Sequence, residues 1–81
     1  MRVRVLFFAL YRDLAGHSQI DLELEAPATA GTAVARLRAM GPGLARLPDR
    51  PAVAVNQQYA RLDAPLDDGD ELALLPPVAG G

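Results

Sequence analysis

The 81-residue sequence predicts one domain of the α+β class, with a mixed sheet and one helix crossing one of its faces. Alternating apolar and polar residues mark strands near both ends of the chain. A central segment repeats apolar residues at three- and four-residue steps, which is typical of an amphipathic helix. Hydrophobic residues make up 51% of the chain and charged residues 22%, a balance that favours a folded globular domain over disorder.

The first segment, MRVRVLFFAL (1–10), alternates in the way of a strand. Its inward positions are Val3, Val5 and Phe7, whereas Arg2 and Arg4 mark the outer side. Farther along, the outer side also becomes apolar, at Leu6, Phe8 and Leu10. Because one helix cannot cover both faces of a sheet, these outer residues are either scattered surface side chains or a patch covered by a partner protein.

Residues 11–19 are predicted to be a link that turns at Gly16, and IDLELE (20–25) a second strand, antiparallel to the first. A helix is expected next, with Thr29 as its N-cap and with Gly41 and Pro42 ending it. The apolar positions of this helix are Ala30, Ala33, Val34, Leu37 and Met40.

After an irregular or one-turn helical connection, the segments AVAVN (52–56) and QYARLD (58–63) are predicted to be strands, the second one brief. In PLDDGDELALL (65–75), Asp68 and Gly69 provide turn chemistry. Leu72 and Leu74 then alternate with Glu71, Ala73 and Leu75 in a closing strand. The predicted domain therefore spans residues 1–75, and residues 76–81 are predicted to be a flexible tail.

The tail, PPVAGG (76–81), has the composition of a stiff stalk with a thin end. Pro76 and Pro77 fix their φ angles, while Gly80 and Gly81 have no side chains to obstruct a narrow channel in another protein. The alternative is that these residues are an ordinary frayed end. If the end is functional, its reactive group is the carboxylate of Gly81, which needs activation, for example by attack on the α-phosphate of ATP.

The composition also excludes several classes of function. A net charge of −2, without clusters of arginine and aromatic residues, argues against nucleic-acid binding. The chain has no cysteine, no lysine, one serine and one histidine, so it offers neither a nucleophilic centre nor a cysteine metal site. No segment approaches the roughly 20 apolar residues that cross a bilayer. A soluble cytoplasmic protein is expected.

Three segments together resemble the small, sulfur-carrier subunits of molybdopterin synthase, the MoaD branch of the MoaD/ThiS family of ubiquitin-like β-grasp proteins. These segments are VRVLFFALYRDLAG (3–16), VNQQ (55–58) and PLDDGDELALLPPVAGG (65–81). The similarity spans nearly the whole chain. It departs from the family pattern at Leu75, where an aromatic residue is common, and at Ala79, where a small polar residue is common.

The resemblance implies a β-grasp fold and a sulfur-transfer cycle. An ATP-dependent activating enzyme adenylates Gly81, the carboxylate becomes a thiocarboxylate, and its sulfur passes to cyclic pyranopterin monophosphate within a heterotetramer with the large subunit. The chain is then a subunit of a sulfurtransferase that is not catalytic in isolation and keeps no permanent cofactor or metal. The inserted tail comprises Pro76, Pro77, Val78, Ala79 and Gly80, and the partner-binding patch comprises Phe8, Tyr59, Leu75 and Arg12.

Other interpretations remain open from the residues. The same tail can serve a sulfur carrier for thiazole synthesis or another pathway, or a ubiquitin-like modifier joined to protein lysines through Gly81. It can also be an accidental feature of a β-grasp binding module. Arg12 either pairs with an acid of a partner or forms only a local surface ion pair.

Overall fold

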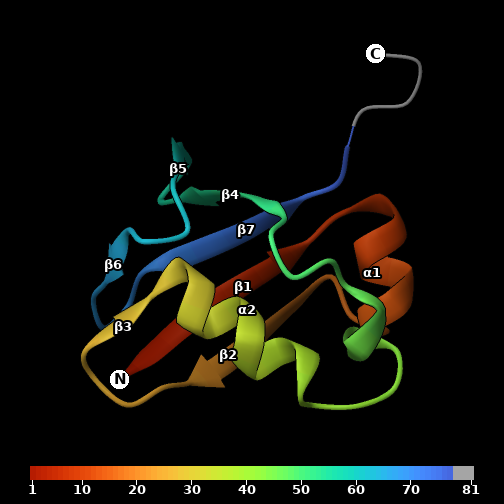
Figure 1. The fold of residues 1–81 in the computed structure, drawn as a ribbon, viewed down its shortest axis with the longest axis horizontal. Coiled ribbons are helices and arrows are strands. Elements are labelled where there is room, and N and C mark those ends of the chain that lie inside the picture. Colours follow the sequence, from red (N-terminus) through yellow and green to blue (C-terminus); the bar gives the residue numbers. More distant parts are fainter. Residues whose placement is uncertain (78–81) are drawn as a thin grey trace.

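The computed structural model describes residues 1–77, which form a mixed five-stranded sheet with the strand order β2-β1-β7-β4-β5 (Figure 1). The central strands β1 and β7 are parallel, and every other neighbouring pair in this sheet is antiparallel. The strands are β1 (Arg2–Phe7), β2 (Gln19–Glu23), β4 (Ala52–Val55), β5 (Gln58–Ala60) and β7 (Glu71–Leu75). The α+β class and the mixed sheet are confirmed.

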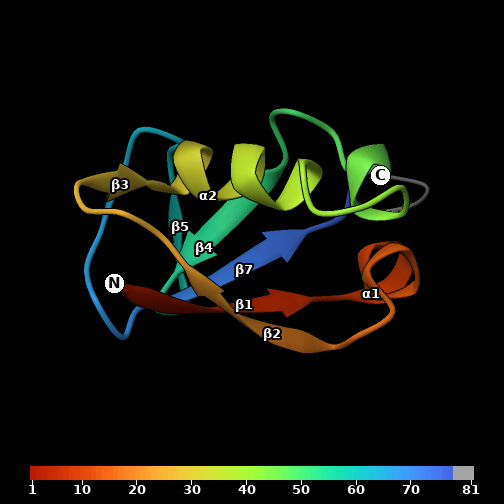
Figure 2. The same ribbon diagram turned by 90° about the horizontal axis from the view of Figure 1, so that it is seen from below.

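Three helical segments and a small second sheet complete the described fold. The helical segments are α1 (Ala9–Ala15), α2 (Ala30–Arg38) and the 3₁₀ turn η1 (Leu44–Arg46). The short strands β3 (Ala28–Thr29) and β6 (Pro65–Leu66) pair antiparallel beside the start of α2. Figure 2 shows α2 lying across one face of the five-stranded sheet, whereas no helix of the described chain covers the opposite face.

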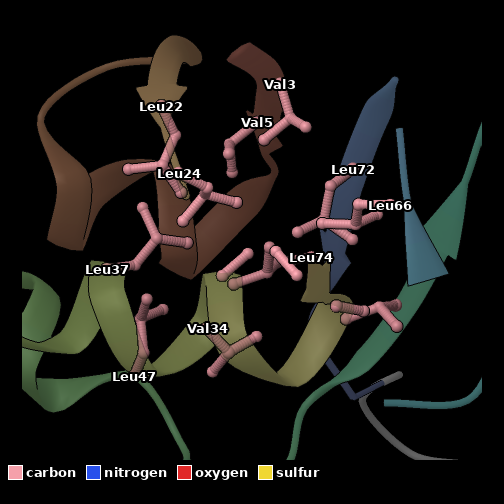
Figure 3. Packing of buried hydrophobic residues seen from close by; sticks show 14 of the residues in the cluster. Val3, Val5, Leu22, Leu24, Val34, Leu37, Leu47, Leu66, Leu72 and Leu74 are labelled. Atoms are coloured by element: carbon pink, nitrogen blue, oxygen red, sulfur yellow. The ribbon is translucent and has the colours of Figure 1, made fainter. Parts of the chain in front are cut away.

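The core fills the space between the sheet and α2. Side chains from β1, β2 and β7 meet Val34 and Leu37 of α2 and Leu47 beyond η1 (Figure 3). Of the inward positions expected for β1, β2 and β7, Ile20 is half-buried and the others are buried, namely Val3, Val5, Phe7, Leu22, Leu72 and Leu74. The period-2 alternation therefore predicted the correct parity of the strands.

Helix α2 begins directly after Thr29, the residue predicted to be its N-cap. The hydroxyl of Thr29 accepts a hydrogen bond from the backbone N–H of Thr32 at 3.1 Å, and the Thr32 hydroxyl accepts one from the N–H of Thr29 at 3.2 Å. This reciprocal pair satisfies two donors that the helix itself leaves without partners. The helix ends at Arg38, so the expectation that Met40 belongs to its buried face is wrong, and Met40 is exposed.

The predicted link after the first strand is instead the helix α1. It buries Tyr11 and half-buries Leu14 and Ala15, a spacing of three and four residues that is typical of a helix packed on one side. Gly16 ends it in the left-handed conformation, with φ of +75°. The strand prediction continued past Phe7 because Phe8 and Leu10 extend the alternation. Leu10 lies on α1 and is 59% exposed.

Hydrogen bonds join the DGDE segment (68–71), at the start of β7, to the turn between β4 and β5. The side-chain amide of Asn56 donates to the Asp70 carboxylate at 3.0 Å, and the Asp67 N–H donates to the same carboxylate at 2.7 Å. The Asn56 side-chain oxygen accepts from the N–H of Glu71 at 2.9 Å. The VNQQ and DGDE motifs thus hold the β4–β5 turn against the start of β7. The Asp70 carboxylate therefore stabilises the turn that precedes β7.

These hydrogen bonds predict a pH dependence of stability. The hydrogen bond from the Asn56 amide, and to a smaller extent that from the Asp67 N–H, lowers the pKa of Asp70 in the folded chain. The ionised Asp70 therefore stabilises the fold at a pH above the pKa that this carboxyl has in the unfolded chain. This stabilisation is lost as the pH falls through the pKa of Asp70 in the folded chain. We expect Asp70→Asn to lower the urea midpoint at neutral pH, and the difference from wild type to shrink at about pH 3. Asp49→Asn, which removes an exposed carboxylate without a hydrogen bond to a described residue, should not reproduce this pattern. A pH-independent Asp70→Asn difference would contradict the assignment.

Candidate protein-docking surface and C-terminal tail

The sheet face opposite α2 carries a straight row of outward side chains. Leu6 on β1 is in register with Ala73 on β7, Ala73 with Ala54 on β4, and Ala54 with Tyr59 on β5. Directly paired residues of neighbouring strands point to the same face. The row therefore has large side chains at its two ends and two alanines in its centre.

This arrangement hollows the sheet surface. Ala54 and Ala73 form the floor, because a methyl group is too short to fill the space between their larger neighbours. The hollow has a volume of about 380 Å³ and is lined by Leu6, Phe8, Ala54, Gln57, Tyr59, Glu71, Ala73 and Leu75. Tyr59 is 86% exposed and Phe8 45% exposed, so two aromatic rings stand at its walls. We call this feature the apolar hollow.

Phe8 reaches this face through the start of α1. It is the N-cap residue, with extended backbone angles, and its side chain makes no capping hydrogen bond. The next residue, Ala9, has a φ of +47°, a conformation that is uncommon for residues other than glycine. The chain turns sharply there into α1, and the ring of Phe8 stays on the outer face.

The remaining outer face is charged. Arg2 donates to Glu23 at 2.8 Å, and this contact, with the charge of Glu23, raises the pKa of Arg2. A second hollow at this end is lined by Met1, Arg2, Arg4, Asp21, Glu23, Asn56, Asp68, Gly69 and Glu71. The outer face thus divides into an apolar half and a charged half, and Glu71 lines both hollows.

The structure brings three of the four residues predicted for the partner patch to one hollow, namely Phe8, Tyr59 and Leu75. Arg12 is exposed on α1, does not line the hollow and forms no ion pair with any residue in the range 1–77. The local ion pair considered for Arg12 is therefore absent from this range. Ala54, Ala73 and Gln57 were not predicted. The sequence alone does not single them out, because they come together only through the pairing of β4 with β5 and β7.

The predicted stalk begins beside the apolar hollow. Leu75, the last residue of β7, lines the hollow, and the half-buried Pro76 and the exposed Pro77 follow directly. Figure 1 shows that β7 runs toward the end of the sheet at which α1 lies. The remaining predicted tail residues, Val78, Ala79, Gly80 and Gly81, lie outside the described residues.

Within residues 1–77, no group of three histidine, cysteine, aspartate or glutamate side chains could hold a metal ion. Among the buried residues of this range, Tyr11 is the only one whose side chain carries a polar group, its phenolic hydroxyl, and none is charged. None of its helices is long and apolar enough to cross a membrane.

A mixed sheet with a parallel central pair, crossed by one helix and left open on its other face, defines the ubiquitin-like β-grasp class. The SAMP1 protein of Haloferax volcanii, a small archaeal modifier protein, superposes on the whole chain with a TM-score of 0.86 and 31% identity, with full coverage of both chains. Subunits 1 and 2 of the molybdopterin-converting factor of Helicobacter pylori form a complex in which a chain matches at a TM-score of 0.71 and 30% identity, again with full coverage of both.

The chain belongs to the ThiS family, which it matches over residues 5–81. The molybdopterin synthase sulfur carrier subunit of Chlamydomonas reinhardtii is 36% identical over 83 residues, covering 100% of each chain. The resemblance inferred from the sequence motifs is thereby confirmed.

Proposed function

We propose that this chain is the sulfur-carrier subunit of a molybdopterin synthase. The observation that carries the proposal is similarity over the full length, from the first strand to the PPVAGG end, to relatives that bear this name. The described residues support it, because they form an exposed apolar hollow beside the point where Pro76 and Pro77 leave the last strand. In this proposal the chain contributes the sulfur-bearing end of a sulfurtransferase, and its partners contribute catalysis.

The proposed chemistry takes place at Gly81. Attack of its carboxylate on the α-phosphate of ATP, bound by an activating enzyme, forms an acyl-adenylate and releases pyrophosphate. A sulfur nucleophile then displaces AMP, and the carboxylate is converted into a thiocarboxylate. This sulfur is donated to cyclic pyranopterin monophosphate. Two carrier chains, each bearing one thiocarboxylate, supply the two sulfurs of one dithiolene. ATP is therefore a substrate of the partner and not a cofactor of this chain.

The large synthase subunit is the proposed occupant of the apolar hollow, in a heterotetramer. The Helicobacter pylori relative has been solved as a complex of subunits 1 and 2, which supports a large-subunit partner. Because Pro76 follows Leu75 at the rim, a partner seated on the hollow also holds the root of the stalk. The two prolines restrict the stalk, which lowers the entropy lost when the tail inserts.

Phe8→Asp is expected to weaken binding of the large subunit by at least roughly tenfold, because aromatic anchors dominate interface energies and the new carboxylate would be dehydrated in an apolar contact. Isothermal titration with the purified large subunit measures this change. Leu10→Asp is the matched control, since Leu10 is an exposed apolar residue of α1 that does not line the hollow. Equal losses in both variants would contradict the proposed docking face.

Intact mass measurement of the small chain, purified with its partner at native expression, tests the proposed function. A sulfur carrier should show a population heavier than the unmodified chain by the mass difference between sulfur and oxygen. Co-purification of the large subunit distinguishes this pathway from thiazole synthesis or another sulfur-transfer pathway. A chain that never carries the added mass in active cells would contradict the proposal.

A second function, a ubiquitin-like modifier, is favoured by one observation. The small archaeal modifier protein 3 of Haloferax volcanii is 36% identical to this chain over 92 residues, with 100% coverage of both. A modifier would be joined through Gly81 to lysines of other proteins. Digestion of the proteome should then yield Gly-Gly remnants on lysines that disappear when the gene for this chain is deleted.

A further inference from the structure

We propose that Glu71 recognises a basic side chain of the docking partner, and that the aliphatic part of this side chain lies in the apolar hollow over Ala54 and Ala73. The inference rests on the proposed docking of the large subunit at this face. It specifies the chemistry that the partner must present there.

Glu71 lies where the two halves of the outer face meet. It is the first residue of β7, it is half-buried, and it lines both the apolar hollow and the charged hollow. Among the residues in the range 1–77 that line the apolar hollow, it is the only one with a carboxylate. A partner that fills the hollow therefore covers this carboxylate as well.

The backbone of Glu71 is held by hydrogen bonds, whereas its side chain has no partner among residues 1–77. Its N–H donates to the Asn56 side-chain oxygen at 2.9 Å, and its carbonyl accepts from the Asn56 N–H at 2.8 Å. Its carboxylate makes no hydrogen bond or ion pair with any residue between 1 and 77. Arg4, its neighbour in register on β1, makes no ion pair within this range either, and the nearby Arg2 is paired with Glu23.

The surrounding charges select a cation. The loop before Glu71 carries Asp67, Asp68 and Asp70, and the strand beyond β1 carries Asp21 and Glu23 on the same outer face. Arg2 and Arg4 offset only part of this negative charge. An acidic partner group would be repelled, and a neutral one would bring no charged donor to the Glu71 carboxylate as it loses water.

The shape of the hollow selects a long side chain. The alanine floor leaves an apolar space between Leu6 and Tyr59, next to the carboxylate of Glu71. Arginine and lysine place an aliphatic stem on apolar surface while the charged group reaches a polar partner. An arginine fits especially well, because its planar group can donate two parallel hydrogen bonds to one carboxylate.

Titration of the purified large subunit with Glu71→Gln and with Glu25→Gln tests this proposal at low and high salt. Both variants remove one negative charge, but the exposed Glu25 does not line either outer-face hollow. We expect Glu71→Gln to weaken binding roughly tenfold and to reduce its salt dependence, because a charge-assisted hydrogen bond is lost. Glu25→Gln should stay within about twofold of wild type, since it changes only the long-range field.

A charge reversal sharpens the test. Glu71→Arg is expected to weaken binding more than Glu71→Gln, and salt should relieve part of the additional loss by screening the repulsion. Unchanged affinity of Glu71→Gln and Glu71→Arg, together with a loss in Phe8→Asp, would refute recognition by Glu71 and leave the docking face intact. Unchanged affinity in all three variants would instead contradict the proposal that this face binds the large subunit.

Discussion

A chain extended by one alanine after Gly81 is expected to fold normally and to lose sulfur loading completely. In the proposed cycle the reactive group is the free carboxylate of Gly81. An added residue converts this group into an internal amide, which does not attack the α-phosphate of ATP, and it moves the only terminal carboxylate one residue away from the reacting position. The described core residues run from Val3 to Leu74, so an extension after Gly81 should not change the free energy of unfolding.

The measurement combines the chain, a matching activating enzyme, ATP and a sulfur source, followed by intact mass analysis of the chain. The matched control adds an alanine before Met1, at the opposite end of the chain, and should load at the wild-type rate. Thermal unfolding of both variants checks that the domain is unchanged. Loading of the C-terminally extended chain at the normal rate would remove the chemical basis of the proposed function.

Gly43→Ala is expected to destabilise the domain by about 1–3 kcal/mol, because the added methyl group has no free space. A β-carbon on Gly43 would overlap the carbonyl oxygen of Leu14, which belongs to the backbone of α1. No side-chain rotation can relieve this overlap, so α1 or the segment that leads into η1 must shift. Gly43 itself has an ordinary φ of −66°, so close approach and not backbone conformation requires the glycine.

Thermal unfolding followed by circular dichroism measures this effect. For a domain of this size, a loss of 1 kcal/mol lowers the midpoint by about 4–8 °C. Gly31→Ala is the matched control, because its β-carbon would lie 3.1 Å from the Leu62 carbonyl oxygen, a tight contact rather than an overlap, and alanine favours the helical backbone of α2. A Gly43→Ala midpoint equal to that of Gly31→Ala would contradict the close packing of α1 against this segment.

The consequences of Gly43→Ala should extend to the apolar hollow. Helix α1 starts directly after Phe8, and its position therefore sets where the Phe8 ring lies beside the apolar hollow. The Gly43 segment and the apolar hollow thus both adjoin the same short helix.

Local patterns determined most of the fold and the chemistry proposed for the end of the chain. Inward and outward positions of β1, β2 and β7 follow from alternation, because successive side chains of a strand point to opposite faces wherever the strand is paired. The start of α2 follows from Thr29, because a cap satisfies donors within one turn. The proposed chemistry of Gly81 depends only on the covalent structure of its carboxylate.

Only the tertiary structure decided how the outer face is built. Ala54 and Ala73 become neighbours because β4 hydrogen-bonds to β7, and the intervening segment gives no local signal for that register. Helix α1 lies where the sequence predicted the end of a strand (residues 9–10) and a link (residues 11–15). The buried Tyr11 and the half-buried Leu14 of this helix pack against the core, and this contact is not visible in the local alternating pattern. The position of Glu71 between two hollows has the same origin: contacts between strands distant in sequence decide which side chains share a surface.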